Sequence, residues 1–400
     1  MARPFTFAGV ELDVRASEAA AVAEPEPLPL NTDSEQPFRI LVLGDFSGDG
    51  EGSPGAVRVH SGNLDGIMRS LHVRTTVSIT GDPSCCVGFE ALEHFEPDSL
   101  FERCDISRRA ECAPEKDSGE LMRAILHDPG FQALEAAWRS LDFLVRGIDD
   151  DDRIQVYVLD IPKQKLAAEL AQASGFRDTA VYQIIVEQPA SSAGAGLWSL
   201  IAGNYSFDRS SAEDVDLLTT LGLLARSARA PFLAEVLPSP GGERAALESW
   251  LALRQSAYAS WVGLAIPRLL LRLPYGKDTR VVEAFDFEEM PGMPRHTDYL
   301  WGNPAFACAS LIARSFAEVG GSFRPGMHLE LERLPLHVYK VGAETRVQPC
   351  AELLLSERDQ EELLRQGLMP LTWVKGRDSA RLIRFQSIAD PPAALSGRWS

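Results

Sequence analysis

A glycine-rich stretch at residues 44–55, GDFSGDGEGSPG, is the first place where residue types and spacing suggest chemistry. It follows an apolar run, as phosphate-binding loops do, but a P-loop also needs Gly-Lys-Ser/Thr to reach the phosphates and the magnesium ion. This stretch has no Lys or Arg and carries Asp45, Asp49 and Glu51, which would repel a phosphate. The aspartate spacing also misses the EF-hand pattern. We therefore predict a flexible surface connection rather than a ligand site.

The densest group of polar side chains lies at residues 285–303, where Asp286, Glu288, Glu289, His296 and Asp298 could converge on a metal ion. The Pro and Gly residues among them indicate an irregular loop, in which charged side chains are normally solvated. The sequence contains no H-E-x-x-H motif and no G-x-S-x-G motif. We therefore predict no catalytic, cofactor-binding or metal-binding residue and no cofactor. An enzyme that uses this loop stays open as an alternative.

One basic segment, IPRLLLRLPYGKDTR at residues 266–280, interrupts the acidic sequence. Its positive charges allow two interpretations, because they could bind an anionic partner or pair with carboxylates of the same chain. Arg268 and Arg272 alternate with leucines, and such arginines usually pair with carboxylates at a packed edge. We favour the second interpretation.

The composition excludes several classes of function. The chain has 39 Lys and Arg against 57 Asp and Glu, and the resulting net charge of −18 repels nucleic acid. The longest apolar stretch, residues 261–274, is interrupted by Pro267 and two arginines, so no segment approaches the roughly 20 apolar residues that cross a bilayer. No secretory signal opens the chain, and six cysteines without a C-x-x-C pair indicate a reducing compartment. We expect a cytoplasmic protein that binds no nucleic acid and inserts into no membrane.

The elements that would position these residues fall into two regions. Residues 1–37 are rich in Pro, Ala and Glu and predict a leader. Residues 38–112 predict a small domain, and residues 113–119 a linker. Within the small domain we expect a strand buried on both faces from residue 38, a helix at 63–70, strands at 73–80 and within 83–92, and a helix after Pro97.

The second region, residues 120–400, opens with the clearest helix. Asp128 is placed to cap it, Pro129 suits its first position and Gly147 can end it, while apolar residues recur every three or four positions between them. Strands at 153–161, 181–187, 197–205 and 231–237 then alternate with helices at 163–173 and 211–229. This order predicts an α/β fold with mixed sheets and crossover helices, in which a small α/β domain is joined to a larger one.

Seven segments of the second region occur in the order known from one family. They are LHDPGFQALEAAWRSLDFLV (126–145), RIQVYVLDIPKQKLAAEL (153–170), LIAGNYSF (200–207), VGLAIPRLLLRLPYG (262–276), FDFEE (285–289), DYLWGNPAFA (298–307) and GLMPLTW (367–373). Together they resemble the large subunit of the type VI secretion contractile sheath, the TssC/VipB family, over residues 120–388. The resemblance assigns a structural core to Phe131, Leu134, Trp138, Leu141, Arg268, Arg272, Pro274, Tyr275, Trp301, Gly302 and Asn303.

Three segments of the first region, FRILVLGDFSG (38–48), NLDGIM (63–68) and ALEHFEPDSLF (91–101), are similar to the small sheath subunit, the TssB/VipA family. The third looks like that family's acidic-Phe-x-Pro-Asp signature, with His94 where the family has an aspartate. The motif residues are Gly44, Asp45, Phe46, Phe95 and Pro97.

The two resemblances imply a fused, shortened sheath protein rather than a catalyst. Sheath subunits of this kind add strands to the sheets of their neighbours around an inner tube, so the implied partners are other sheath subunits, with the tube protein, the baseplate and a recycling AAA+ ATPase as further ones. The large-subunit part lacks the family's usual C-terminal strands. This keeps open a sheath-associated cap, baseplate adaptor or regulator that does not polymerise.

Overall fold

The computed structural model describes residues 36–52, 55–77, 85–106, 117–148, 153–171, 176–191, 196–238 and 244–399. Parts of three expectations from the sequence lie outside these ranges: residues 1–35 of the leader, residues 113–116 of the linker, and residues 53–54 of the glycine-rich loop. The last part of the expected linker is helical, because Asp117 caps α4 (Ser118–Leu126) by accepting a hydrogen bond from the Glu120 amide at 2.6 Å.

A nine-stranded mixed sheet forms the centre of the molecule, in the order β11-β15-β14-β8-β7-β6-β1-β5-β2. The strands β5, β1, β6, β7, β8 and β14 are parallel to one another, and antiparallel strands complete both edges. The strands are β1 (Phe38–Gly44), β2 (Val57–Val59), β5 (Ile154–Asp160), β6 (Leu200–Phe207), β7 (Phe232–Val236), β8 (Val262–Ile266), β11 (Glu330–Leu331), β14 (Leu368–Trp373) and β15 (Ala380–Leu382). The mixed α/β class predicted from the sequence is confirmed.

Strand β1 shows why the run Ile40 to Leu43 is apolar without a break. Successive side chains of a strand point to opposite faces. Ile40 and Val42 enter a core under α5 (Pro129–Arg146) and α11 (Pro304–Val319), whereas Leu41 and Leu43 enter a second core. That second core lies under α6 (Lys163–Leu170), α9 (Ala212–Ala228) and α10 (Arg244–Arg254). A central parallel strand buried on both faces needs this composition.

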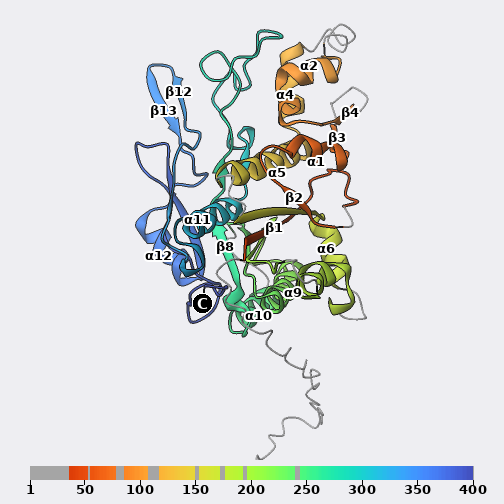
Figure 1. Cartoon of the computed structure of the whole chain (residues 1–400). Helices are drawn as coiled ribbons and strands as arrows, with labels where there is room; N and C mark the ends of the chain where they lie inside the picture. Colours follow the sequence, from red (N-terminus) through yellow and green to blue (C-terminus); the bar gives the residue numbers. More distant parts are fainter. Residues whose placement is uncertain are drawn as a thin grey trace, which may run out of the picture. The chain divides into compact units, whose positions relative to one another are not determined.

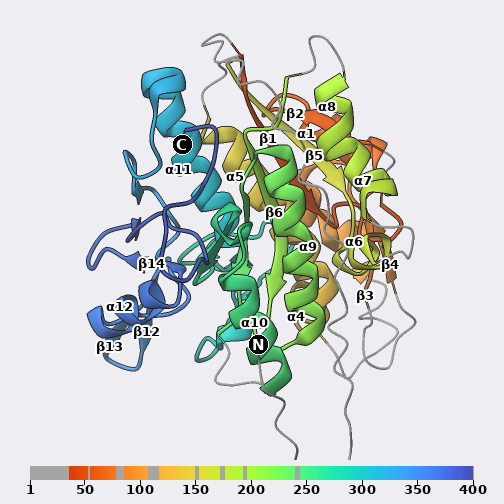
Figure 2. The ribbon, with the colours of Figure 1, turned by 90° about the horizontal axis from the view of Figure 1, so that it is seen from below.

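Helices therefore cover both faces of the sheet. Figure 1 shows α5 and α11 on one side of β1 and β8 and α9 and α10 on the other, and the view from below in Figure 2 places α9 in front of β6. Among the described residues, no helix is long and apolar enough to span a membrane.

Smaller elements surround this framework. The first region adds α1 (Leu64–Ser70), the hairpin β3 (Arg74–Val77) and β4 (Cys85–Gly88), η1 (Leu92–Phe95) and α2 (Pro97–Arg103). The C-terminal part adds the pair β9 (Leu269–Leu270) and β10 (Trp301–Gly302), the hairpin β12 (His337–Val341) and β13 (Glu344–Gln348), and α12 (Glu357–Arg365). Single turns complete it at η2 (Phe176–Asp178), η4 (Ala259–Trp261), η5 (His296–Asp298) and η6 (Gly320–Ser322).

The division into a small and a large α/β domain differs from what the structure shows. Strand β1, assigned to the small domain, pairs in parallel with β5 and β6, which were both assigned to the large one. Residues 34–400 form a single compact unit. The reason is that β1 is apolar on both faces and can be buried only between other strands.

The strand predicted at 181–187 is wrong, because these residues are helical. They lie in α7 (Ala180–Tyr182) and in η3 (Gln183–Glu187), a π-helical turn that continues into α8 (Gln188–Ser191). Thr179 caps this helix by accepting a hydrogen bond from the Tyr182 amide at 3.2 Å, and the Glu169 carboxylate accepts one from the Val181 amide at 2.9 Å. A short apolar run is ambiguous between strand and buried helix, and here the caps decide in favour of the helix.

Candidate functional site

The four α5 residues predicted to form a structural core lie on one face of that helix. Asp128 caps the helix by accepting hydrogen bonds from the amides of Gly130 and Phe131 at 2.9 and 3.0 Å, as the sequence predicts. Each of the four predicted residues is at most 3% exposed: Phe131, Leu134, Trp138 and Leu141. The helix therefore presents a continuous apolar stripe to the sheet.

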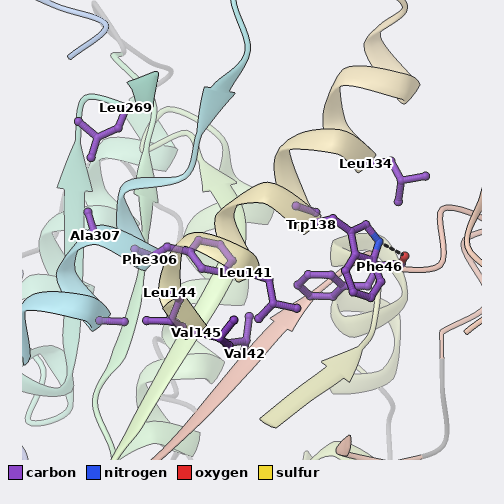
Figure 3. Close-up of a cluster of buried hydrophobic side chains, with 14 of the residues drawn as sticks. Val42, Phe46, Leu134, Trp138, Leu141, Leu144, Val145, Leu269, Phe306 and Ala307 are labelled. Carbon is purple, nitrogen blue, oxygen red and sulfur yellow. Dashed lines mark hydrogen bonds between the residues drawn. The ribbon is translucent and has the colours of Figure 1, made fainter. Parts of the chain in front are cut away.

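Trp138 connects this stripe to the motif of the first region. Its indole Nε1 donates a hydrogen bond of 2.9 Å to the carbonyl oxygen of Phe46, and the two aromatic rings meet nearly at right angles with centroids 5.5 Å apart (Figure 3). Phe46 itself is fully buried. Two residues expected in different domains thus form one contact of a single core.

The acidic-Phe-x-Pro-Asp signature makes a second connection between the regions. The ring of Phe95 stacks on Phe89 with centroids 4.1 Å apart, and both meet the edge of Phe131. Pro97 occupies the first turn of α2, as expected from its fixed φ angle. The Asp98 carboxylate accepts hydrogen bonds from the amides of Glu283 and Ala284 at 2.9 and 2.7 Å.

Gly44 and Asp45 lead from β1 into the glycine-rich loop. A Cβ atom on Gly44 would lie only 2.9 Å from the Cβ of Asn204 on the neighbouring strand, which explains the glycine. Burial raises the pKa of Asp45, with a smaller contribution from the negative charge of Asp160, against the hydrogen bond from the Gly48 amide.

The described part of that loop is anchored rather than loose, which differs from the flexible connection predicted. The Asp160 carboxylate accepts hydrogen bonds from the amides of Phe46 and Ser47 at 2.6 and 3.1 Å, and Lys165 donates one to the carbonyl of Glu51. Within the loop, the Asp45 carboxylate accepts a hydrogen bond from the Gly48 amide at 2.8 Å, and the Asp49 carboxylate accepts one from the Ser47 hydroxyl at 2.9 Å.

Arg272 lies at the centre of a buried network of ion pairs. Its guanidinium group donates to the Glu135 carboxylate at 2.9 and 3.4 Å and to the Glu289 carboxylate at 2.8 and 3.1 Å, and all three side chains are at most 5% exposed. It also lies 4.5 Å from the centre of the Tyr275 ring. Arg139 extends the network, since it donates to Glu135 at 2.7 Å.

The ionisation of these groups follows from burial and from one another's charge. Burial alone would raise the pKa of Glu289, but the charge of Arg272 and hydrogen bonds from Arg272 and the Tyr275 amide lower it to about 2. Burial raises the pKa of the Tyr275 hydroxyl to about 12. Desolvation disfavours the charge of Arg272, yet the two carboxylates outweigh it and raise its pKa. Arg272 and Glu289 are therefore both charged at neutral pH.

Arg268 confirms the same interpretation of the basic segment. It makes a bidentate pair with Glu352 at 2.9 and 2.6 Å and lies 3.6 Å from Glu235. Lys277 pairs with Asp286 at 3.0 Å, and Arg280 pairs with Glu96 of the first region. The positive charges of this segment are therefore matched by carboxylates of the same chain, as we favoured.

The remaining predicted residues join β9, β10 and α11. Asn303 caps α11 by accepting a hydrogen bond from the Ala305 amide at 2.9 Å, and its side-chain amide donates to the Tyr205 carbonyl at 3.0 Å. A Cβ atom on Gly302 would lie 2.5 Å from Leu271 Cδ2. Two further positions complete the set: the Trp301 indole donates to the carbonyl of His296 at 3.0 Å, and the carbonyl of buried Pro274 accepts from Thr279.

The loop considered for metal binding has its carboxylates engaged elsewhere. Glu289 binds Arg272, and Asp298 binds Arg295 at 2.8 Å. Asp286 pairs with Lys277, and Glu288 accepts a hydrogen bond from the Lys277 amide. Within the part of the chain that the structure describes, no group of three His, Cys, Asp or Glu side chains is arranged to hold a metal ion.

The sequence analysis did not identify the carboxylates that take part in these contacts. Glu135, Glu289, Asp98 and Glu96 were not singled out as structural residues, although they hold Arg272, residues 283–284 and Arg280. Glu135 could have been recognised from the sequence, because it is the single charged residue on the buried face of α5. A charge within an apolar stripe requires a buried partner.

Comparisons with known proteins identify relatives of this chain. A family model described as VipB, the EvpB/VC_A0108 tail sheath N-terminal domain, matches residues 115–242 and 241–389. The type VI secretion system sheath protein TssC1 of Pseudomonas aeruginosa is 32% identical over 290 residues, which cover 67% of this chain and 58% of that protein. A chain in the cryo-EM structure of the anti-feeding prophage baseplate aligns with a TM-score of 0.38 at 12% identity, covering 88% of this chain and 63% of that chain.

The fold and its packed core define an α/β protein, in which the predicted motif residues hold elements together. The chain belongs to the VipB tail sheath N-terminal domain family. This membership agrees with the prediction that it is not an enzyme. The chain spans 58% of the length of the curated relative it matches. The family match begins at residue 115, so the resemblance of residues 38–105 to the small sheath subunit stays a prediction.

Proposed function

We propose that this chain is a structural subunit of a type VI secretion contractile sheath, working in the cytoplasm and assembling with other sheath subunits by strand addition around an inner tube. The observation that carries the proposal is the family match over residues 115–389, together with a curated relative that is itself a type VI sheath protein. The use of the predicted motif residues for packing and ion pairing supports a mechanical rather than a catalytic role.

We further propose that residues 38–105 act as a built-in small-subunit-like segment. The position of β1 supports this, because β5 and β6 both pair with β1 and not with each other. Without residues 38–44 the sheet of the family-matched region would be divided between these two strands. A segment that fills this position from within the same chain fixes the two parts at a one-to-one ratio.

The proposed partners are other sheath subunits, whether copies of this chain or full-length relatives. The inner tube protein, the baseplate and a recycling AAA+ ATPase are further proposed partners. These partners are inferred from the type of assembly, and no particular residue of this chain is assigned to contact them. Nucleic acid is not among the proposed partners because of the net charge of −18.

The test is to express the chain alone and together with full-length sheath subunits and to examine both samples by negative-stain electron microscopy. Long tubes that contain the chain along their length are the expected result. Labelling confined to tube ends would replace the proposal with the alternative of a cap, adaptor or regulator. A monodisperse protein that never associates with sheaths would contradict both.

A further inference from the structure

A cleft of about 560 Å³ lies between α5, α11 and residues 332–335. Polar and apolar side chains both line it, and Leu269, Leu271, Phe306 and Leu334 are among the apolar ones that form its floor. Figure 3 shows Phe306 beside the α5 residues Leu141 and Leu144, with Leu269 farther from them. The cleft thus opens next to the main core and can accept an apolar side chain.

Four arginines surround this apolar floor, and two of them lack a carboxylate. Arg139 pairs with Glu135 and Arg146 pairs with Asp142, each at 2.7 Å. Arg314 and Arg333 line the same cleft, and within the described residues neither has an ion-pair partner. One further carboxylate, that of Glu332, also lines the cleft. The cleft therefore carries excess positive charge on a chain whose net charge is −18.

Ser140 gives an independent sign that the cleft receives an occupant. This lining residue is 1% exposed, and its buried hydroxyl oxygen has no hydrogen-bond partner in the described structure. A buried polar group without a partner costs on the order of 1–3 kcal/mol, so such groups normally gain a partner from a ligand or water. A polar atom entering the cleft would supply it.

A surface of matching chemistry lies elsewhere on the same chain. Leu354 is 70% exposed, more than any other large hydrophobic side chain described. It stands just before α12, whose exposed carboxylates are Glu357, Asp359, Glu361 and Glu362 against two arginines, Arg358 and Arg365. We call Leu354 and these four acidic residues the acidic knob.

We propose that the arginine-lined cleft binds the acidic knob of a second copy of this chain. The apolar floor takes Leu354, and Arg314 and Arg333 face the carboxylates of α12. The cleft and the knob are different patches, so the contact is heterologous and can repeat from copy to copy. This inference rests on the proposed function as an assembling subunit and names one surface that such assembly would use.

Charge reversal tests the proposal with the full chain. We expect the mass measured by sedimentation velocity to rise with concentration for the wild type. Arg314→Glu with Arg333→Glu, and separately Glu361→Arg with Glu362→Arg, should each weaken self-association by at least about tenfold. Mixing the two variants pairs an acidic cleft with a basic knob and should restore association to within about threefold of the wild type. Leu354→Asp should weaken it as well.

The matched control reverses two exposed arginines outside the cleft, Arg324→Glu with Arg384→Glu, and should leave association unchanged. Unchanged circular dichroism spectra would show that all variants are folded. A monomeric wild type, unaltered association of the cleft variant, or absence of restoration in the mixture would each overturn the inference. Tubes formed with full-length sheath subunits would still support the proposed function, so the two failures are distinguishable.

Discussion

Arg272 holds the two regions of the ion-pair network together, because one guanidinium group binds carboxylates from α5 and from the loop at 285–289. A fully buried charge is tolerated only when it is paired and hydrogen-bonded. Here each carboxylate meets the fork of the guanidinium in a geometry that a lysine does not reproduce. At the residue scale, this position is expected to tolerate substitution least.

We predict that Arg272→Met destabilises the fold by about 3–5 kcal/mol, because the substitution leaves Glu135 and Glu289 buried without their main partner. Urea denaturation followed by circular dichroism measures the effect. Lys277→Met is the matched control, since it removes a cation from an exposed pair and should leave stability nearly unchanged. Equal losses in the two variants would contradict the importance assigned to burial.

Glu289 makes stability depend on acidic pH. Its pKa is about 2 in the folded chain against an ordinary value of 4.5, so ionised Glu289 stabilises the fold fully above the ordinary value. That contribution is lost as pH falls from about 4.5 towards about 2. We predict that the free energy of unfolding decreases less steeply over this range in Glu289→Gln than in the wild type. Parallel pH profiles from urea titrations would contradict this.

At the scale of elements, the position of α5 depends on how well the buried face of the helix packs against the sheet. Cap residues and apolar spacing predict where this helix starts and ends, and the structure agrees within a residue. The same reasoning failed at residues 181–187, because a few apolar residues in a row fit a strand and a buried helix equally well. The deciding interactions there come from Thr179 and Glu169, and the contact with Glu169 depends on tertiary packing.

We predict that Trp138→Asp yields no soluble native protein, because it places a charge in the fully buried centre of the α5 stripe. Trp138→Phe keeps an aromatic ring but loses the hydrogen bond to the Phe46 carbonyl. It should cost about 1–3 kcal/mol and leave the fold intact. The soluble yield and the thermal unfolding curve measure the two effects. A native-like Trp138→Asp protein would show that the packing of this helix has been misassigned.

At the scale of the whole molecule, the two regions expected as separate domains depend on each other. Strand β1, Phe46, Phe95 and Asp98 of the first region all contact residues that follow position 117. Seven of the structural residues inferred from the sequence belong to this joint core: Phe46, Phe95, Phe131, Leu134, Trp138, Leu141 and Tyr275. Each region therefore depends on contacts with the other, which neither region's sequence shows alone.

We predict that residues 112–400 expressed alone are insoluble, because β5 and β6 lack the strand that joins them. Co-expression of residues 1–111 as a separate chain should restore solubility, with both pieces recovered in one complex of one-to-one stoichiometry. Co-purification through a tag on one piece measures this. A folded, monodisperse 112–400 fragment would contradict the prediction.

The sequence by itself determined the fold class and five helices, α1, α2, α5, α6 and α9, because these depend on local periodicity, caps and apolar runs. Motif order in residues 120–388 also led to the sheath family that the comparisons found. Only the tertiary structure decided that β1 belongs between β5 and β6, and which carboxylate pairs with which arginine. Such choices are made between residues far apart in the chain, where the energy of burial and pairing depends on three-dimensional neighbours that local sequence does not specify.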